Sequence, residues 1–137
     1  MNNTVVNLIV LGSTGSIGRQ ALEVVDLHPE RFRVLGLAAY DELDLLEMQV
    51  RKYQPRMIAL GNASLYNECR ARIGDRAEIL TGVEGLCELA AMEGADTVLA
   101  ALSGAVGIKP TLAAIKKSRR IALANKETLV AAGDIVM

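Results

Sequence analysis

Short, continuous runs of apolar residues alternate along the chain with longer stretches in which apolar residues recur every three or four positions. A continuous apolar run predicts a strand that is covered on both faces, and the 3.6-residue period predicts an amphipathic helix. We expect strands at residues 5–11, 32–39, 57–60, 77–80, 96–101 and 120–124. We expect helices at 16–27, 42–53, 64–73 (capped by Ser64), 82–92 and 108–117, and a further helix that begins at 125.

This alternation predicts the fold class, an α/β domain with a doubly wound parallel sheet of the Rossmann type. In the Rossmann strand order, right-handed crossovers bring the carboxyl ends of the first, fifth and sixth strands to one crevice, where such sheets bind ligands. The last expected helix is still running at Met137. We therefore expect residues 1–137 to be one incomplete domain of a longer protein, with the catalytic and C-terminal domains absent from this chain.

The first expected strand leads into Gly12-Ser-Thr-Gly-Ser-Ile-Gly18, in which three glycines are spaced by three and a helix follows. Gly12 allows the chain to turn without a Cβ clash. Gly15 allows a pyrophosphate to approach the backbone, and Gly18 allows the helix to lie close to the sheet. This strand–turn–helix arrangement predicts a dinucleotide-binding site.

The helix after the loop adds polar groups to the predicted site, because its first N–H groups and its dipole favour an anion. The hydroxyls of Ser13, Thr14 and Ser16 lie where phosphate oxygens would bind. The alternative is a structural turn that binds nothing. The residues expected to hold the dinucleotide are Gly12, Thr14, Gly15, Ser16, Ile17 and Gly18. The helix residues expected to face the core are Ile17, Ala21, Val24 and Val25.

A second polar segment, Asn125-Lys126-Glu127, follows the sixth expected strand directly. Asn125 can cap the next helix and also bind a nicotinamide ribose, Lys126 offers a point charge to an anionic substrate, and Glu127 can accept from a hydroxyl. The alternative is a capping Asn beside an exposed Lys–Glu pair. The spacing alone does not separate these two interpretations.

The charge and cysteine content narrow the class of protein. A net charge of −1 without a long charge run gives no surface for nucleic acid or a membrane. No signal peptide or apolar run of membrane-spanning length is present in the sequence. Cys69 and Cys87 form no metal or redox motif, and we expect both to be inert buried thiols in a reduced, cytoplasmic protein.

Four segments carry a resemblance to a known family: Gly12–Gly18, His28–Val34, Ser103–Gly107 followed by Pro110–Ile115, and Ala124–Val130. In this order they resemble the N-terminal part of the 1-deoxy-D-xylulose 5-phosphate reductoisomerases of the non-mevalonate isoprenoid pathway. The resemblance covers essentially all 137 residues. Its specificity comes from the combination of the glycine loop with Asn125-Lys126-Glu127.

The resemblance implies an enzyme that isomerises 1-deoxy-D-xylulose 5-phosphate and reduces the product with NADPH to 2-C-methyl-D-erythritol 4-phosphate. By the same resemblance, Thr14–Ile17 hold the cofactor, Asn125 and Glu127 face it, and Lys126 touches the phosphorylated sugar. The family binds a divalent metal (Mg or Mn) through an Asp and two Glu in and beyond a D-S-E motif that lies past Met137. We therefore expect no metal ligand and no catalytic residue within this chain, and a homodimer when the protein is full length.

The turn after the second expected strand departs from the family pattern. Relatives usually carry Gly, then Lys or Arg, then Asn or Ser there, which holds the 2′-phosphate of NADP, whereas this chain has Tyr40-Asp41-Glu42. An acidic residue at this point is typical of NAD sites, where it accepts from the ribose 2′-hydroxyl. We keep Tyr40, Asp41 and Glu42 as cofactor-binding candidates and NADPH as the cofactor, since Arg19 could compensate for the acids. Asp41 and Glu42 could equally be only the start of the following helix.

Two rival functions remain open at this point. Acyl-phosphate-type semialdehyde dehydrogenases share a similar glycine loop, but they need a catalytic Cys and a His, which would have to lie beyond Met137. A non-catalytic nucleotide-binding module would need nothing beyond the present domain.

Overall fold

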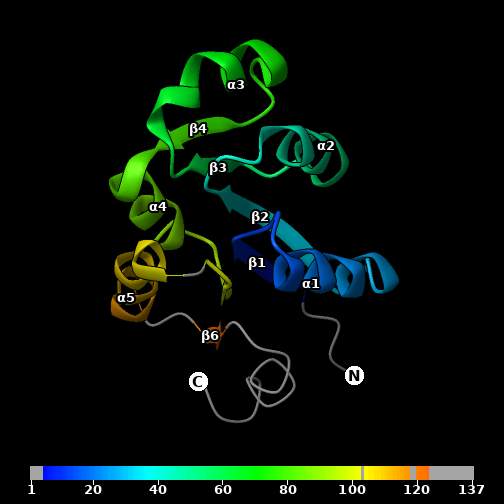
Figure 1. Cartoon of the computed structure of the whole chain (residues 1–137). Helices are drawn as coiled ribbons and strands as arrows, with labels where there is room; N and C mark the ends of the chain where they lie inside the picture. The colour runs from blue at the N-terminus through cyan, green and yellow to red at the C-terminus, as the bar shows by residue number, and fades with distance from the viewer. Residues whose placement is uncertain (1–4, 103, 118–119, 124–137) are drawn as a thin grey trace.

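The structure is a computed structural model that describes residues 5–102, 104–117 and 120–123. Within these ranges, six parallel strands form one sheet in the order β4-β3-β2-β1-β5-β6, with helices on both faces (Figure 1). The strands are β1 Val6–Leu11, β2 Phe32–Ala39, β3 Met57–Leu60, β4 Glu78–Thr81, β5 Thr97–Ala100 and β6 Arg120–Leu123. The helices are α1 Ser16–Leu27, α2 Leu43–Tyr53, α3 Tyr66–Ile73, α4 Gly82–Ala90 and α5 Ile108–Lys116, with short 3₁₀ turns at η1 Ala63–Leu65 and η2 Gly104–Gly107.

The predicted fold class is confirmed, and every predicted strand is present within one or two residues of its expected bounds. Successive residues of β1 point to opposite faces of the sheet, as the strand period requires. Leu8 and Val10 pack with α1, α2 and α3, and Ile9 and Leu11 pack with α4 and α5. Figure 1 shows these two helical layers on either side of the sheet. Both faces of the sheet are therefore covered, which explains why its strands contain continuous apolar runs such as Leu8–Leu11.

Two local predictions about the helices were wrong. Val24 on α1 is 49% exposed, whereas Val25 is buried as expected, together with Gly18 and Leu22 at the helical period. Ser64 does not cap a helix over 64–73, because the side-chain oxygen of Asn62 accepts from the backbone N–H of Ser64 (3.1 Å) and from its hydroxyl (2.7 Å). Asn62 therefore starts η1, and α3 begins only at Tyr66.

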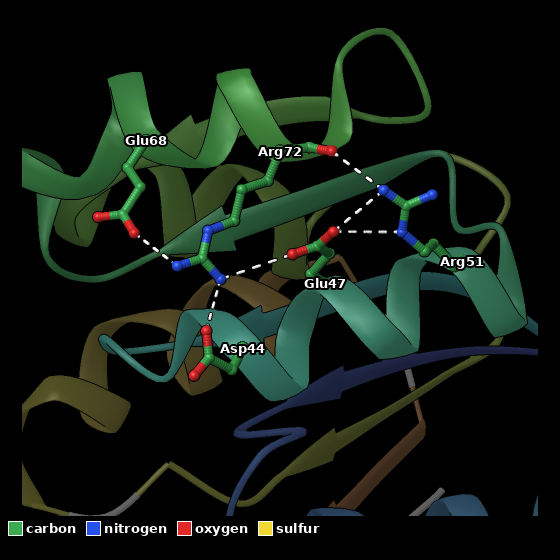
Figure 2. A network of polar contacts seen from close by, with 5 residues as sticks. All are labelled: Asp44, Glu47, Arg51, Glu68 and Arg72. Atoms are coloured by element: carbon green, nitrogen blue, oxygen red, sulfur yellow. Dashed lines mark hydrogen bonds and ion pairs between the residues drawn. The ribbon is translucent and has the colours of Figure 1, made fainter.

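An ion-pair network holds α3 against α2. Figure 2 shows the guanidinium of Arg72 on α3 between Asp44 and Glu47 of α2, with Glu68 of its own helix as a third partner. Arg51 of α2 binds Glu47 (3.0 Å) and also donates to the carbonyl oxygen of Arg72 (3.3 Å). Exposed pairs contribute little singly, but a network of this kind fixes the position of α2. That helix borders the candidate site.

Candidate functional site

The strand order changes direction between β1 and β5, and this switch point defines the candidate site. Leu11 of β1 pairs with Ala100 of β5, and Ala100 in turn pairs with Leu123 of β6. The backbone N–H of Gly12 donates to the carbonyl oxygen of Ala38 in β2 (2.7 Å), so the second strand ends at the same edge. Open parallel sheets bind ligands at such a point. The predicted meeting of the carboxyl ends of β1, β5 and β6 is confirmed.

Gly12 and Gly18 are required by the fold itself. Gly12 has a φ of +91°, and a Cβ there would lie 2.5 Å from the carbonyl oxygen of Ala101, where the chain leaves β5. A Cβ on Gly18 would overlap the carbonyl oxygen of Gly12 and come within 2.8 Å of the Cα of Ser13. No side chain fits at either position. The turn is thus packed tightly between β5 and the first turn of α1.

Gly15 has no such requirement. Its φ of −81° and ψ of 174° are extended backbone that any residue adopts. A Cβ there would meet only the carbonyl oxygen of Gly12, at an ordinary contact distance of 3.6 Å, and the residue is exposed. The fold therefore leaves open backbone at this point of the loop, where the sequence predicts that a pyrophosphate approaches.

The N-terminus of α1 is open to an anion. Gly15 is its N-cap residue and supplies no side chain, and the first turn carries no acidic residue. Ser16 is exposed and Thr14 is partly exposed, as a phosphate site needs. Ser13 differs from the prediction, because its side chain is fully buried and its hydroxyl cannot reach a ligand at the surface of the loop. The backbone of Ser13 is bound to β2, since its N–H donates to the carbonyl oxygen of Ala38 (2.9 Å).

Sequence reasoning missed Gln49, which supports the loop from behind. Gln49 is only 6% exposed, and its amide nitrogen donates to the carbonyl oxygen of Ser13 (2.9 Å). The available signal was its position three residues after Leu46 and directly before Val50, on the face of α2 that the core covers. A polar residue on an apolar stripe indicates a buried partner.

The turn after β2 lies beside the glycine loop, at the carboxyl ends of the strands. Tyr40 is 49% exposed, and its ring fills the place that a Cβ on Gly61 would take. Asp41 and Glu42 are exposed, and neither side chain makes a hydrogen bond or ion pair with another described residue. Glu42 occupies the N-cap position of α2, but its side chain makes no capping hydrogen bond. Both acids are therefore available to a ligand.

Arg19 lies on the side of α1 that faces α2. Together with Leu45 and Met48 it lines a groove between the two helices. Asp41 and Glu42 directly precede the first turn of α2. Arg19 therefore lies on the α2 side of the site, which is also the side of Asp41 and Glu42.

The glycine turn η2, Gly104–Gly107, forms the opposite wall. A Cβ on Gly107 would lie 2.6 Å from the carbonyl oxygen of Leu102, so the start of α5 packs directly on the segment that leaves β5. The hydroxyl of Thr111 donates to the carbonyl oxygen of Gly107 (2.8 Å) and Pro110 is buried in the first turn, where its missing N–H is harmless. The wall next to the glycine loop is thus fixed by backbone contacts.

Other expected residues lie elsewhere or outside the described ranges. Asn125, Lys126 and Glu127, which follow β6 in the sequence, are outside the described residues. Cys69 is buried, and burial raises the pKa of its thiol, whereas Cys87 is partly exposed rather than buried as expected. Among the described residues, no three His, Cys, Asp or Glu side chains gather closely enough to hold a metal ion. None of the described helices combines the length and apolar character needed to cross a bilayer.

At the end of the sheet opposite the glycine loop, a polar cluster joins the C-terminal ends of α1 and α2. Lys52 binds one carboxylate oxygen of Asp26 (2.9 Å), and the Tyr53 hydroxyl donates to the other (2.8 Å). The hydrogen bond from Lys52 is the main reason that the pKa of Asp26 is lowered. With its charges paired internally, this cluster ties the two helices together at the end opposite the glycine loop.

Comparison with known proteins agrees with these features. The family model described as 1-deoxy-D-xylulose 5-phosphate reductoisomerase matches residues 8–133. A curated reductoisomerase from Synechococcus sp. (strain JA-2-3B'a(2-13)) is 48% identical over 133 residues, which cover 95% of this chain and 34% of that protein. A reductoisomerase from Bacillus anthracis is 45% identical over 127 residues, covering 93% of this chain and 33% of that protein.

Solved structures give the same result. The crystal structure of a DOX-P reductoisomerase in complex with NADPH, fosmidomycin and magnesium has a TM-score of 0.84 and 40% identity, covering 96% of this chain and 33% of that one. The Zymomonas mobilis enzyme in complex with NADPH has a TM-score of 0.83 and 36% identity, covering 97% of this chain and 35% of that one. The chain spans about a third of the length of the curated relatives it matches. Because the family model covers nearly the whole chain and the fold follows the solved relatives, the chain belongs to the 1-deoxy-D-xylulose 5-phosphate reductoisomerase family.

Proposed function

We propose that this chain forms the NADPH-binding part of a 1-deoxy-D-xylulose 5-phosphate reductoisomerase. The observation that carries the proposal is Gly15, a glycine that neither φ nor packing requires, at the uncapped N-terminus of α1 and at the switch point of the sheet. The family supports the identity of the dinucleotide, because solved relatives are complexes with NADPH. The family match also favours this activity over a semialdehyde dehydrogenase or a nucleotide-binding module without catalysis.

In this proposal each wall of the site binds a different part of the cofactor or the substrate. The backbone around Thr14, Gly15 and Ser16 binds the pyrophosphate, and Tyr40 with the two acids borders the adenosine end. The nicotinamide end extends toward β5 and β6, where Asn125 and Glu127 face it and Lys126 contacts the phosphorylated sugar. Bound NADPH supplies the hydride that reduces the isomerised substrate. The packed glycine turn keeps the loop from shifting while the ligand binds.

The rest of the activity is proposed for parts of the protein that this chain does not span. We assign the divalent metal ion, Mg²⁺ or Mn²⁺, and most substrate contacts to the two thirds of the family length that this chain does not span. We propose that the complete protein is a cytoplasmic homodimer. The support for the metal is that solved relatives bind magnesium. The residues of this chain would thus position the cofactor, and the remainder would carry the isomerisation.

Calorimetric titration and an assay of NADPH oxidation test this division. We expect the 137-residue chain alone to bind NADPH saturably, with one site per chain. With 1-deoxy-D-xylulose 5-phosphate and Mg²⁺ or Mn²⁺ added, the chain alone should oxidise no NADPH. A metal-dependent rate from the chain alone would overturn the division, and a failure to bind NADPH in a folded chain would overturn the proposed function.

Asp41→Lys is expected to strengthen the preference for NADPH over NADH by about tenfold, which is about 1.4 kcal/mol. Two unit charges about 4 Å apart interact by about 4 kcal/mol at an effective dielectric near 20. Exposure and salt reduce this to about 1 kcal/mol for an acid on the surface. Asp41 therefore weakens 2′-phosphate binding without preventing it, and the substitution replaces this repulsion with attraction.

The measurement is a pair of titrations with NADPH and NADH on each variant. Glu30→Lys is the matched control, since it makes the same charge change in an exposed residue at the amino edge of the sheet. If the wild type already rejects NADH completely and Asp41→Lys changes nothing, Asp41 and Glu42 serve only as the start of α2.

A further inference from the structure

Gln49 and Ser13 form an isolated polar contact inside an apolar interface. They are the two polar side chains that are buried among the described residues, at 6% and 0% exposure. Leu46 and Val50, on the same face of α2 as Gln49, are both fully buried. The contact joins α2 to the glycine loop across 36 residues of sequence, through the amide nitrogen of Gln49 and the carbonyl oxygen of Ser13 (2.9 Å).

Stability does not account for this contact. The amide oxygen of Gln49 and the hydroxyl of Ser13 are both buried without a hydrogen-bond partner among the described residues. A buried polar atom without a partner costs free energy. Gln49 provides a hydrogen bond to the carbonyl oxygen of Ser13, but its own amide oxygen is left without one. A methionine of similar length would fill the same space, exchanging the unmet amide oxygen for a Ser13 carbonyl oxygen without its Gln49 donor. The contribution specific to glutamine is therefore its hold on the carbonyl oxygen of Ser13.

The direction of that carbonyl determines the direction of the next N–H. The carbonyl of Ser13 and the N–H of Thr14 belong to one planar trans peptide and point in opposite directions. With the carbonyl turned inward to Gln49, the N–H of Thr14 points away from α2. That N–H makes no hydrogen bond with another described residue.

The preceding peptide, which joins Gly12 to Ser13, is held as well. The backbone N–H of Ser13 donates to the carbonyl oxygen of Ala38 at the end of β2 (2.9 Å). Beyond it, the N–H of Gly15 makes only a long bond to the carbonyl oxygen of Gly12 (3.2 Å). Gln49 and Ala38 thus anchor the segment that enters the open part of the loop.

We infer that Gln49 is a positioning residue for the cofactor. By holding the Ser13 carbonyl inward, it aims the free N–H of Thr14 at the pyrophosphate, next to the open N-terminus of α1. This role rests on the proposed function, and it adds a residue from α2 that the ligand never touches.

The test compares NADPH affinity and thermal stability in four proteins: wild type, Gln49→Met, Gln49→Leu and the control Val50→Ala. We expect NADPH to bind about tenfold more weakly to both Gln49 variants, with the melting temperature changed no more than in the control. Val50→Ala removes apolar packing from the same helix, so it should lower the melting temperature and leave the NADPH affinity within twofold. Without ligand, the amide resonance of Thr14 should shift in the Gln49 variants and stay in place in the control.

Each outcome decides a different question. Wild-type affinity for NADPH in a folded Gln49→Met or Gln49→Leu protein would overturn the inference. So would an affinity loss that Val50→Ala shares, or a failure of both Gln49 variants to fold, because either result makes the contact merely structural. If the wild type itself binds no NADPH, the proposed function fails, while the Thr14 resonance still reports whether Gln49 sets the loop.

Discussion

Gly15→Val is expected to abolish measurable NADPH binding, with an affinity loss of roughly 100-fold or more, while the fold is retained. The open backbone at Gly15 is the surface on which the pyrophosphate would lie, and a branched side chain takes that space. Inside the protein the new side chain meets little, since even its Cβ lies 3.6 Å from the nearest atom, the Gly12 carbonyl oxygen. A β-branched residue at an N-cap costs about 1 kcal/mol, which lowers the melting temperature by only a few degrees.

Calorimetric titration together with thermal unfolding measures both effects. Gly15→Ala should give an intermediate loss of affinity, because one methyl group intrudes less than two branches. Gln20→Val is the matched control, with the same new side chain on the exposed side of the same helix. If Gly15→Val retains native affinity together with a native fold, the pyrophosphate does not bind at this loop.

Gly18→Ala is expected to destabilise the protein by about 2–4 kcal/mol, as overpacking and backbone strain do in the larger cases. An exposed Gly→Ala change within a helix usually stabilises by up to about 1 kcal/mol, so the sign here is opposite to the propensity. The reason is the overlap of the new methyl group with the Gly12 carbonyl oxygen and the Ser13 Cα. These atoms are backbone, which cannot move aside as a flexible side chain would.

Chemical unfolding followed by circular dichroism provides the measurement. Gly15→Ala again serves as the comparison, since it makes the same chemical change three residues away and should cost less than about 1 kcal/mol. A Gly18→Ala protein that is as stable as the wild type would show that α1 lies farther from the turn than the structure places it.

The sequence was sufficient to predict the sheet. Strands covered on both faces, such as Leu8–Leu11, are continuous apolar runs, and this pattern depends on no distant partner. The roles of Gly12 and Gly18 were equally readable, because a strand, a glycine turn and a helix constrain one another locally.

What the sequence could not show depends on contacts between distant segments. The burial of Ser13 and its link to Gln49 arise from packing α2 against a loop 36 residues earlier, and no local pattern encodes that distance. The exposure of Val24 follows from which side of α1 meets the sheet, and Val24 and Leu22 are equally apolar in sequence. Asn62 competes with Ser64 for the same cap, and only the path of the chain after β3 favours Asn62.

The most direct test of the central claim is a map of backbone amide chemical shifts as NADPH is added to the 137-residue chain. We expect the largest changes at Thr14, Gly15 and Ser16, with smaller ones at Tyr40–Glu42. Amides near Asp26 and Tyr53, at the opposite edge of the sheet, should not change. If the changes instead gather around Asp26 and Tyr53, or if none appear at saturating NADPH, the glycine loop is not the cofactor site.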